Sequence, residues 1–165
     1  MDFSRNGFEA AGFQGFLTIH ELQNGKIGNI PAQSGVYAVL RDPRQEVGFL
    51  SENPGGHFKG KNPTVPVVTL KEEWVANAEV VYLGKAGSAT GAGTLQKRLR
   101  QYMTFGQGKP VGHWGGRYIW QLADSKSLQV CWKTTPGEAA PQVEQQLIQE
   151  FTRLYGRRPF ANLRD

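Results

Sequence analysis

The chain has 165 residues, enough for one domain with a buried core, and its composition is that of a folded protein rather than a fibrous or disordered one. Its formal net charge of +5 favours an acidic partner such as nucleic acid. No stretch is long and apolar enough to cross a membrane, and residues 1–9 lack the pattern of a secretory signal, so we expect a cytoplasmic protein with no membrane partner. Cys131 is the single cysteine, which excludes an intrachain disulfide and a cysteine-based zinc cluster.

The N-terminal segment, residues 1–33, is too apolar for a solvated tail. We expect it to be an arm packed on a domain formed by residues 34–165. The aromatic side chains that favour this packing are Phe3, Phe8, Phe13 and Phe16.

The first half of that domain contains two predicted strands separated by a long insertion. Residues 35–40 alternate between two faces, and residues 79–84 are almost wholly apolar, which predicts a central strand for the second run. The intervening residues 41–78 contain several turn signals, an extended piece at 65–70 and a short helix at 70–78. We therefore expect an inserted subdomain between the two strands.

The second half is predicted to contain two amphipathic helices and a hairpin. Thr94 is a suitable N-cap for one helix, and Pro141 suits the first turn of the other. Residues 118–122 and 128–133 are predicted to be strands joined by a tight turn. The expected fold is therefore α/β, of the α+β type, with a small and mostly antiparallel sheet flanked by helices.

Two charged side chains occupy helix positions that normally carry apolar ones. Glu144 lies within the apolar stripe of the last helix, and Arg98 lies at the edge of the stripe on the earlier helix. Because an unpaired buried charge is costly, each needs a partner. One interpretation is structural, an ion pair with an arginine, which could be Arg98, or a favourable helix dipole. The other is functional, with Glu144 as a metal ligand or catalytic acid at the edge of a pocket, and Arg98 is open to the same two interpretations.

The segment between Glu79 and Asp124 contains no acidic residue and several basic ones. Its glycine-rich loop, residues 84–93, departs from known nucleotide-binding patterns but can still offer backbone N–H groups to a phosphate at the start of a helix. Tryptophans interleaved with Arg117 favour core packing by default and base stacking as the alternative. The whole segment is either a polyanion-binding face or an ordinary solvated one. Its basic residues are Lys85, Lys97, Arg98, Arg100, Lys109 and Arg117.

Gly35-Val36-Tyr37 and Tyr82-Leu83-Gly84 resemble the two name-giving motifs of the GIY-YIG endonucleases. That family places an arginine on the helix after the second motif, then a glutamate on a later helix, then an asparagine after a proline. In this sequence Arg98, Glu144 and Asn162 stand in those places. The resemblance extends over roughly residues 34 to 163.

The resemblance implies metal-dependent hydrolysis of DNA phosphodiester bonds, with Mg²⁺ or Mn²⁺ as cofactor and duplex or branched DNA as substrate. Tyr37 is the expected general base, its pKa lowered by a cation such as Lys85 or Arg98. Tyr82 would position the water or the phosphate, Arg98 would bind the scissile phosphate, and Glu144 would hold the metal ion. The resemblance gives supporting backbone roles to Gly35, Gly84 and Asn162.

This sequence departs from the family pattern in ways that affect the site. The triplets are separated by a long insertion, and Tyr102 stands where many members carry a histidine, a role that His113 could take if it is not an ordinary surface residue. The alternatives to a nuclease are a non-catalytic nucleic-acid-binding module on the same fold and a purely structural or protein-binding domain. A homodimer is compatible with cutting both strands. The expected nucleic-acid contacts are Lys85, Lys97, Arg100, Tyr102, His113 and Arg117.

Overall fold

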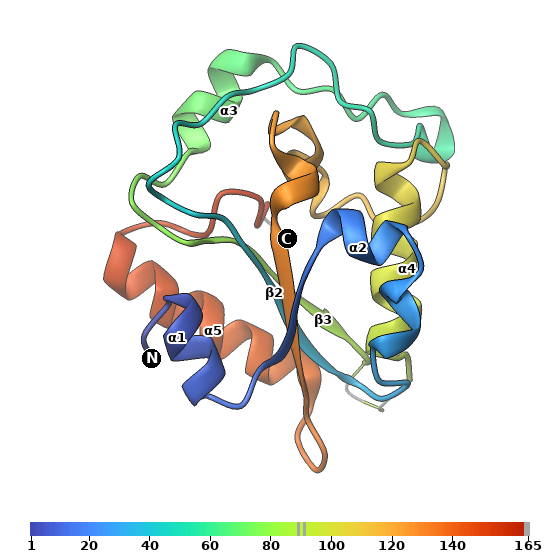
Figure 1. Ribbon diagram of the computed structural model, residues 1–165, viewed down its shortest axis with the longest axis vertical. Coiled ribbons are helices and arrows are strands. Elements are labelled where there is room, and N and C mark those ends of the chain that lie inside the picture. The colour runs from blue at the N-terminus through green and yellow to red at the C-terminus, as the bar shows by residue number, and fades with distance from the viewer. Residues whose placement is uncertain (89, 91, 164–165) are drawn as a thin grey trace.

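The structure is a computed structural model that describes residues 1–88, 90 and 92–163. Across these residues the fold is α+β, with five α-helices and a four-stranded, antiparallel open sheet in the order β1-β4-β2-β3 (Figure 1). No helix in the described part combines the length and apolarity needed to span a bilayer. The strands are β1 (Gln14–Thr18), β2 (Gly35–Leu40), β3 (Val80–Ala86) and β4 (Gln129–Thr134). The helices are α1 (Arg5–Ala10), α2 (Ile19–Gln23), α3 (Val67–Glu73), α4 (Leu95–Gly106) and α5 (Ala140–Tyr155).

The alternation along β2 divides the core into two layers. Val36 and Ala38 face the layer that α1 and α5 cover, whereas Tyr37 and Val39 face the layer that contains α2 and α4 (Figure 1). Every residue of β2 is buried, because strands pair with it on both sides and helices cover both faces.

Five predicted elements, three strands and two helices, are confirmed, with bounds that differ by at most a few residues. Strands β2, β3 and β4 form where alternation or apolar runs predict them. The side chain of Thr94 caps α4 by accepting from the N–H of Lys97, and Pro141 lies in the first turn of α5. Gly156 ends α5 in the left-handed region, as a helix C-cap glycine commonly does.

Three local predictions are wrong. The segment predicted as a strand at 118–122 is a 3₁₀ helix, Arg117–Gln121, so the predicted hairpin does not form. The piece predicted as extended at 65–70 instead enters α3, which begins at Val67 and replaces the helix expected at 70–78. The strand expected to be central, β3, lies at the edge of the sheet.

The free edge of β3 is covered by the C-terminal segment. Asn162 spans the backbone of Leu83, accepting from its N–H through Oδ1 at 2.9 Å and donating to its carbonyl through Nδ2 at 2.7 Å. The N–H of Ala161 donates to the carbonyl of Val81 at 2.8 Å. The exposed row of backbone groups that an edge strand presents is thereby partly satisfied within the chain.

The N-terminal segment contributes a strand to the sheet. β1 pairs antiparallel with β4, with an irregularity between Gly15 and Leu17. Phe3 and Phe8 then pack with α5 in the second core layer, where Phe3 meets the ring of Phe151 edge-on. Residues 1–33 therefore form part of the sheet and of the core.

The insertion, residues 41–78, arches over one end of the molecule and carries α3 (Figure 1). The buried side chain of Gln121 fastens it, because its amide donates to the carbonyls of Leu50 and Val65 while its oxygen accepts from the N–H of Val65. Val65 and Leu70 are buried in the same layer as Tyr37. The insertion therefore shares the core of the domain.

Candidate functional site

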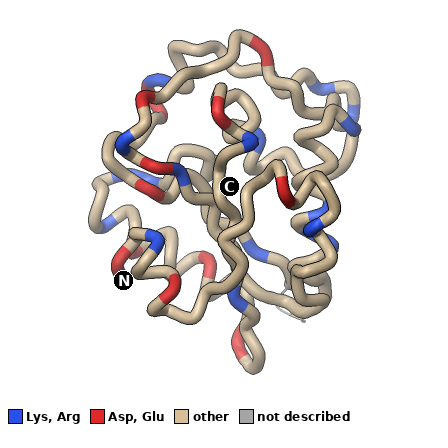
Figure 2. Tube along the Cα trace, in the orientation of Figure 1, with Lys and Arg blue, Asp and Glu red and all other residues tan. Residues whose placement is uncertain are grey.

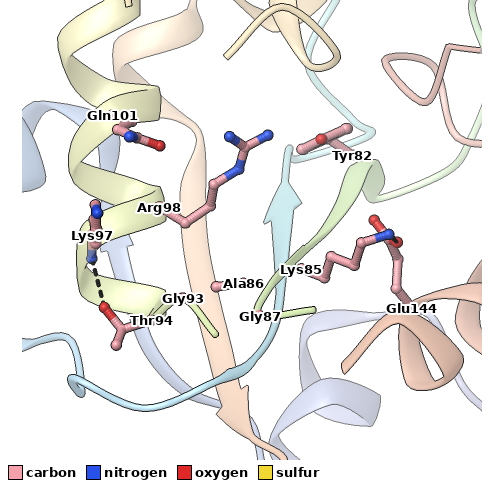
Figure 3. Close-up of a pocket in the computed structure, with 10 residues that line it drawn as sticks. All are labelled: Tyr82, Lys85, Ala86, Gly87, Gly93, Thr94, Lys97, Arg98, Gln101 and Glu144. Carbon is pink, nitrogen blue, oxygen red and sulfur yellow. Dashed lines mark hydrogen bonds and ion pairs between the residues drawn. The ribbon is translucent and has the colours of Figure 1, made fainter. Parts of the chain in front are cut away.

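A cavity of about 480 Å³ lies between the end of β3, the first half of α4 and the first turns of α5 (Figure 3). Charged and polar side chains from all three elements point into it. Its lining residues are Tyr82, Lys85, Ala86, Gly87, Gly93, Thr94, Lys97, Arg98, Gln101 and Glu144.

Glu144 reaches this cavity from α5, and its partner is Lys85. The Nζ of Lys85 lies 2.8 Å from a carboxylate oxygen of Glu144, and the two side chains are 41% and 16% exposed (Figure 3). This ion pair explains how a carboxylate can lie on the apolar stripe of α5. The partner of Glu144 is Lys85, and not Arg98 as one interpretation of the sequence had it. A partly exposed ion pair of this kind is weak enough to exchange for another charged ligand.

Arg98 extends from α4 over the cavity toward Tyr82 (Figure 3). One guanidinium nitrogen donates to the carbonyl of Gly112 at 3.0 Å, which fixes the side chain on the loop that follows α4. The cavity thus collects Lys85, Lys97 and Arg98 against the single carboxylate of Glu144. This excess of positive charge suits a phosphate. Figure 2 shows that acidic and basic residues are otherwise interspersed over the molecule.

The register of β2 against β3 explains why the two tyrosines need glycine neighbours. Tyr37 stands directly across from Gly84, and a Cβ at Gly84 would collide with the Tyr37 ring. Without that Cβ, the rings of Tyr37 and Tyr82 come to 5.9 Å between centroids. Tyr82 lines the cavity, whereas Tyr37 is only 1% exposed and lies behind it.

His113 lies beside Tyr37 in the buried layer. The Tyr37 hydroxyl and the Nε2 of His113 are 2.9 Å apart, while the Nδ1 of His113 is buried without a hydrogen-bond partner among the described residues. The imidazole stacks on the ring of Tyr102 at 3.7 Å, with only 2° between the planes, and the Tyr102 hydroxyl donates to the carbonyl of Gly116 at 2.6 Å. Tyr102 thus holds a histidine supplied by the loop after α4.

Burial controls the protonation of these rings. It raises the pKa of Tyr37 well above its usual value, and it raises the pKa of Tyr82 to about 12, with Glu144 adding to the rise and Arg98 opposing it. Burial also lowers the pKa of His113 well below its usual range. The expectation that a neighbouring cation lowers the phenol pKa is therefore wrong, because desolvation outweighs the charge of Arg98. Near pH 7 both phenols are protonated and the imidazole is neutral.

The start of α4 does not offer its backbone to a phosphate, contrary to the sequence-based expectation. The N–H groups of Leu95 and Gln96 donate to carbonyls in residues 31–33, and that of Lys97 donates to Thr94. These are groups that an anion at a helix N-terminus would need. The glycine-rich loop before the helix falls partly outside the described residues, at 89 and 91. Side chains, not helix N–H groups, make this cavity basic.

Other residues predicted from the sequence lie away from the cavity. Tyr102 and His113 are completely buried, so neither forms the surface contact expected of it. Arg100 is exposed on α4 but does not line the cavity, and Arg117 lines a separate groove. Gly35 has the supporting role expected, since a Cβ there would collide with the backbone of β4.

Two contributors to the cavity were missed in the sequence. Gln101 lies one turn after Arg98 on α4, and helical spacing places it on the same side. Thr94 lines the cavity as well as capping the helix. The contact between His113 and Tyr37 carried no sequence signal beyond the tyrosine at position 102.

The site could hold Mg²⁺ or Mn²⁺ only with few protein ligands. The described residues contain no cluster of three or more ligating side chains. Glu144 alone supplies a carboxylate to the cavity, and Mg²⁺ is commonly held by one or two carboxylates together with substrate phosphates and water.

No protein-family model, curated protein or solved structure matches the chain.

Proposed function

We propose that this protein is a metal-dependent endonuclease that hydrolyses DNA phosphodiester bonds. The observation that carries the proposal is the convergence of Tyr82, Arg98 and Glu144 in one basic cavity, although they come from three different elements. Their order along the chain also matches the GIY-YIG resemblance. Fixed cations, a carboxylate and a polar group in one cleft are the parts that phosphodiester hydrolysis requires.

The arginine and lysines bind the substrate. Arg98 binds the scissile phosphate through its planar guanidinium, which is already oriented by its bond to Gly112, so little of its freedom is lost on binding. Lys97 and Lys85 add positive charge to the same cavity. In the transition state the phosphoryl oxygens gain charge, which Arg98 is placed to stabilise.

The proton of the attacking water requires a different acceptor from a free phenolate. With a pKa of about 12, Tyr82 is almost wholly protonated at pH 7, and burial also raises the pKa of Tyr37 well above its usual value. A phenol that donates its own proton as it accepts another never becomes a free phenolate, so the free energy of ionising it is not required. In our proposal Tyr82, which lines the cavity, orients the attacking water, and Tyr37 accepts the proton of that water while its own proton passes to Nε2 of the neutral His113, so that hydroxide attacks phosphorus.

Glu144 is the residue that would hold the metal ion. A bound Mg²⁺ or Mn²⁺ supplies Lewis-acid stabilisation of the charge on the phosphate and the leaving oxygen. Lys85 must then exchange its bond to Glu144 for one to the substrate, which its exposed and flexible side chain allows.

A nucleic-acid-binding module without turnover is the second candidate. Two observations favour it: Lys85 already neutralises Glu144, and both phenols are protonated and buried. A cavity of this charge can bind a phosphate without cleaving it.

The test is cleavage of plasmid, branched and single-stranded DNA by purified protein, with Mg²⁺ or with EDTA. Glu144→Gln and Tyr37→Phe are each expected to reduce metal-dependent cutting by about 10²-fold or more, the scale of a lost catalytic group. Glu138→Gln is the matched control, because this glutamate is exposed and lies outside the cavity. Unchanged cutting by Glu144→Gln would refute the metal role, whereas salt-sensitive binding without cutting would establish the binding module.

A further inference from the structure

A second, larger groove, of about 730 Å³, lies on the far side of the loop formed by residues 112–117. The 3₁₀ helix that begins at Arg117, the last turns of α5 and the C-terminal segment form its walls. Its lining residues are Glu73, Trp114, Gly115, Arg117, Tyr118, Thr152, Arg157, Arg158, Phe160, Asn162 and Leu163.

Three arginines face one acidic residue in this groove. Arg157 pairs with Glu73 only at 3.4 Å, with both side chains about half exposed, so that bridge is weak. Arg117 has no acidic partner within the described part of the chain, and its guanidinium carbon lies over the Trp114 ring, 4.4 Å from the ring centroid. The Nε of Arg117 is buried without a hydrogen-bond partner among the described residues. A half-buried arginine whose charge no carboxylate neutralises favours an anionic ligand.

The groove neighbours the candidate active site. The loop 112–117 separates them: Gly112 fixes Arg98 on one side, while Trp114 and Arg117 line the groove on the other. α5 runs along both, with Glu144 in the cavity and Thr152 in the groove. Eight residues of helix span about 12 Å. DNA rises by about 3.4 Å per nucleotide along one strand, so this offset corresponds to three or four nucleotides.

We propose that this arginine groove binds the DNA sugar-phosphate backbone three or four nucleotides away from the phosphate held by Arg98. Arg117, braced on Trp114, and Arg157 and Arg158 from the C-terminal segment are the phosphate contacts. The inference rests on the proposed function for the identity of the ligand, but it concerns binding and needs no turnover. Contacts of this type position a duplex without reading its sequence.

The test is equilibrium binding of fluorescent duplex DNA in EDTA, where no cutting occurs, measured by anisotropy over a range of salt concentrations. The Arg157→Ala/Arg158→Ala double variant is expected to bind at least 5-fold more weakly at 0.1 M salt. Its plot of log affinity against log salt should be shallower by about one for each phosphate that the variant no longer neutralises. Arg117→Gln should give a similar loss, and circular dichroism would establish that each variant is folded. Arg153→Ala, an exposed arginine of α5 that lines neither cavity, is the matched control and should bind like the unaltered chain.

Duplex length separates this groove from the active-site cavity. On a duplex too short to extend three nucleotides beyond the cavity, the groove variants should bind like the unaltered protein. Unchanged affinity and salt dependence on long duplexes would overturn the groove while leaving the nuclease proposal intact. Weakened binding by the variants of a protein that never cuts DNA would retain the groove and refute the nuclease. If Arg153→Ala weakens DNA binding as much as the groove variants do, the effect comes from the net charge of the protein and not from the groove, and the proposal is overturned.

Discussion

Tyr102 positions a neighbouring histidine, His113, by stacking against its ring. It stands where the resembling family often carries a histidine, and it is completely buried. Its hydroxyl holds the loop through Gly116, and its ring supports the imidazole of His113. The histidine that lies next to Tyr37 thus comes from a different segment of the chain, the loop after α4.

The buried imidazole should make stability depend on pH. In the folded state the pKa of His113 lies well below 6.5, whereas in the unfolded chain it lies near 6.5, so below pH 6.5 the unfolded state binds more protons. The free energy of unfolding should therefore fall as the pH drops from about 6.5, by up to about 1.4 kcal/mol per pH unit from this residue. Urea unfolding at pH 7.5 and 5.5 measures the effect.

His113→Gln should weaken this pH dependence, since glutamine can still hydrogen-bond to Tyr37 but does not titrate. His20→Gln removes an exposed histidine on α2 and is the control. An identical loss of stability between the two pH values in the unaltered chain and in His113→Gln would contradict the prediction.

At the scale of elements, secondary structure was predicted correctly where the hydrophobic pattern of the sequence matches the burial of the residues. β2 alternates because it has two distinct faces, and α4 and α5 carry one apolar stripe each. The prediction of a strand at residues 118–122 was wrong because Tyr118, Ile119 and Trp120 are all buried. Aromatic and β-branched side chains are common in strands, but here they reflect burial and not an extended backbone. The helix at α3 includes Val67 and Val68, whose β-branching favours extended chain in isolation.

The candidate site was predictable in part. The positions of Arg98 and Glu144 on apolar stripes indicated a site, because charges there need partners. The partner of Glu144 was not predictable, since Lys85 is far away in sequence and only the packing of α5 beside β3 brings the two together. The same holds for the carbonyls of residues 31–33, which occupy the N–H groups at the start of α4.

The two hydrogen bonds from the side chain of Asn162 to the backbone of Leu83, here called the clamp, should stabilise the edge strand β3. Asn162→Ala removes both side-chain bonds to Leu83 and should lower the free energy of unfolding by about 1–3 kcal/mol, the cost of leaving partly buried backbone groups unpaired. Asn29→Ala, at an exposed asparagine, should leave stability within about 0.5 kcal/mol. Urea denaturation of the two variants provides the comparison, and equal stabilities would show that the edge strand does not need its clamp.

At the scale of the whole molecule, one side chain couples the insertion to the domain. Gln121→Leu keeps the volume but leaves the N–H and carbonyl of Val65 and the carbonyl of Leu50 without their partner. We expect a loss of about 3 kcal/mol or more, because several buried polar groups lose their hydrogen bonds at once. Trypsin should also cut the unaltered chain more slowly than the variant at Lys59 and Lys61, which are exposed on the insertion. Gln107→Leu, at an exposed position, is the control, and a protease pattern shared by all three proteins would contradict the coupling.

The strand order also governs how the chain can be made. Thr18 pairs with Gln129, so the first strand of the sheet finds its neighbour only after nearly four fifths of the chain has been synthesised. Until then Phe3, Phe8 and Phe13, together with β1, have no finished sheet to join. Such distant pairing slows folding, because a long loop must close before its contacts form. During synthesis, β1 therefore stays unpaired until β4 has been made.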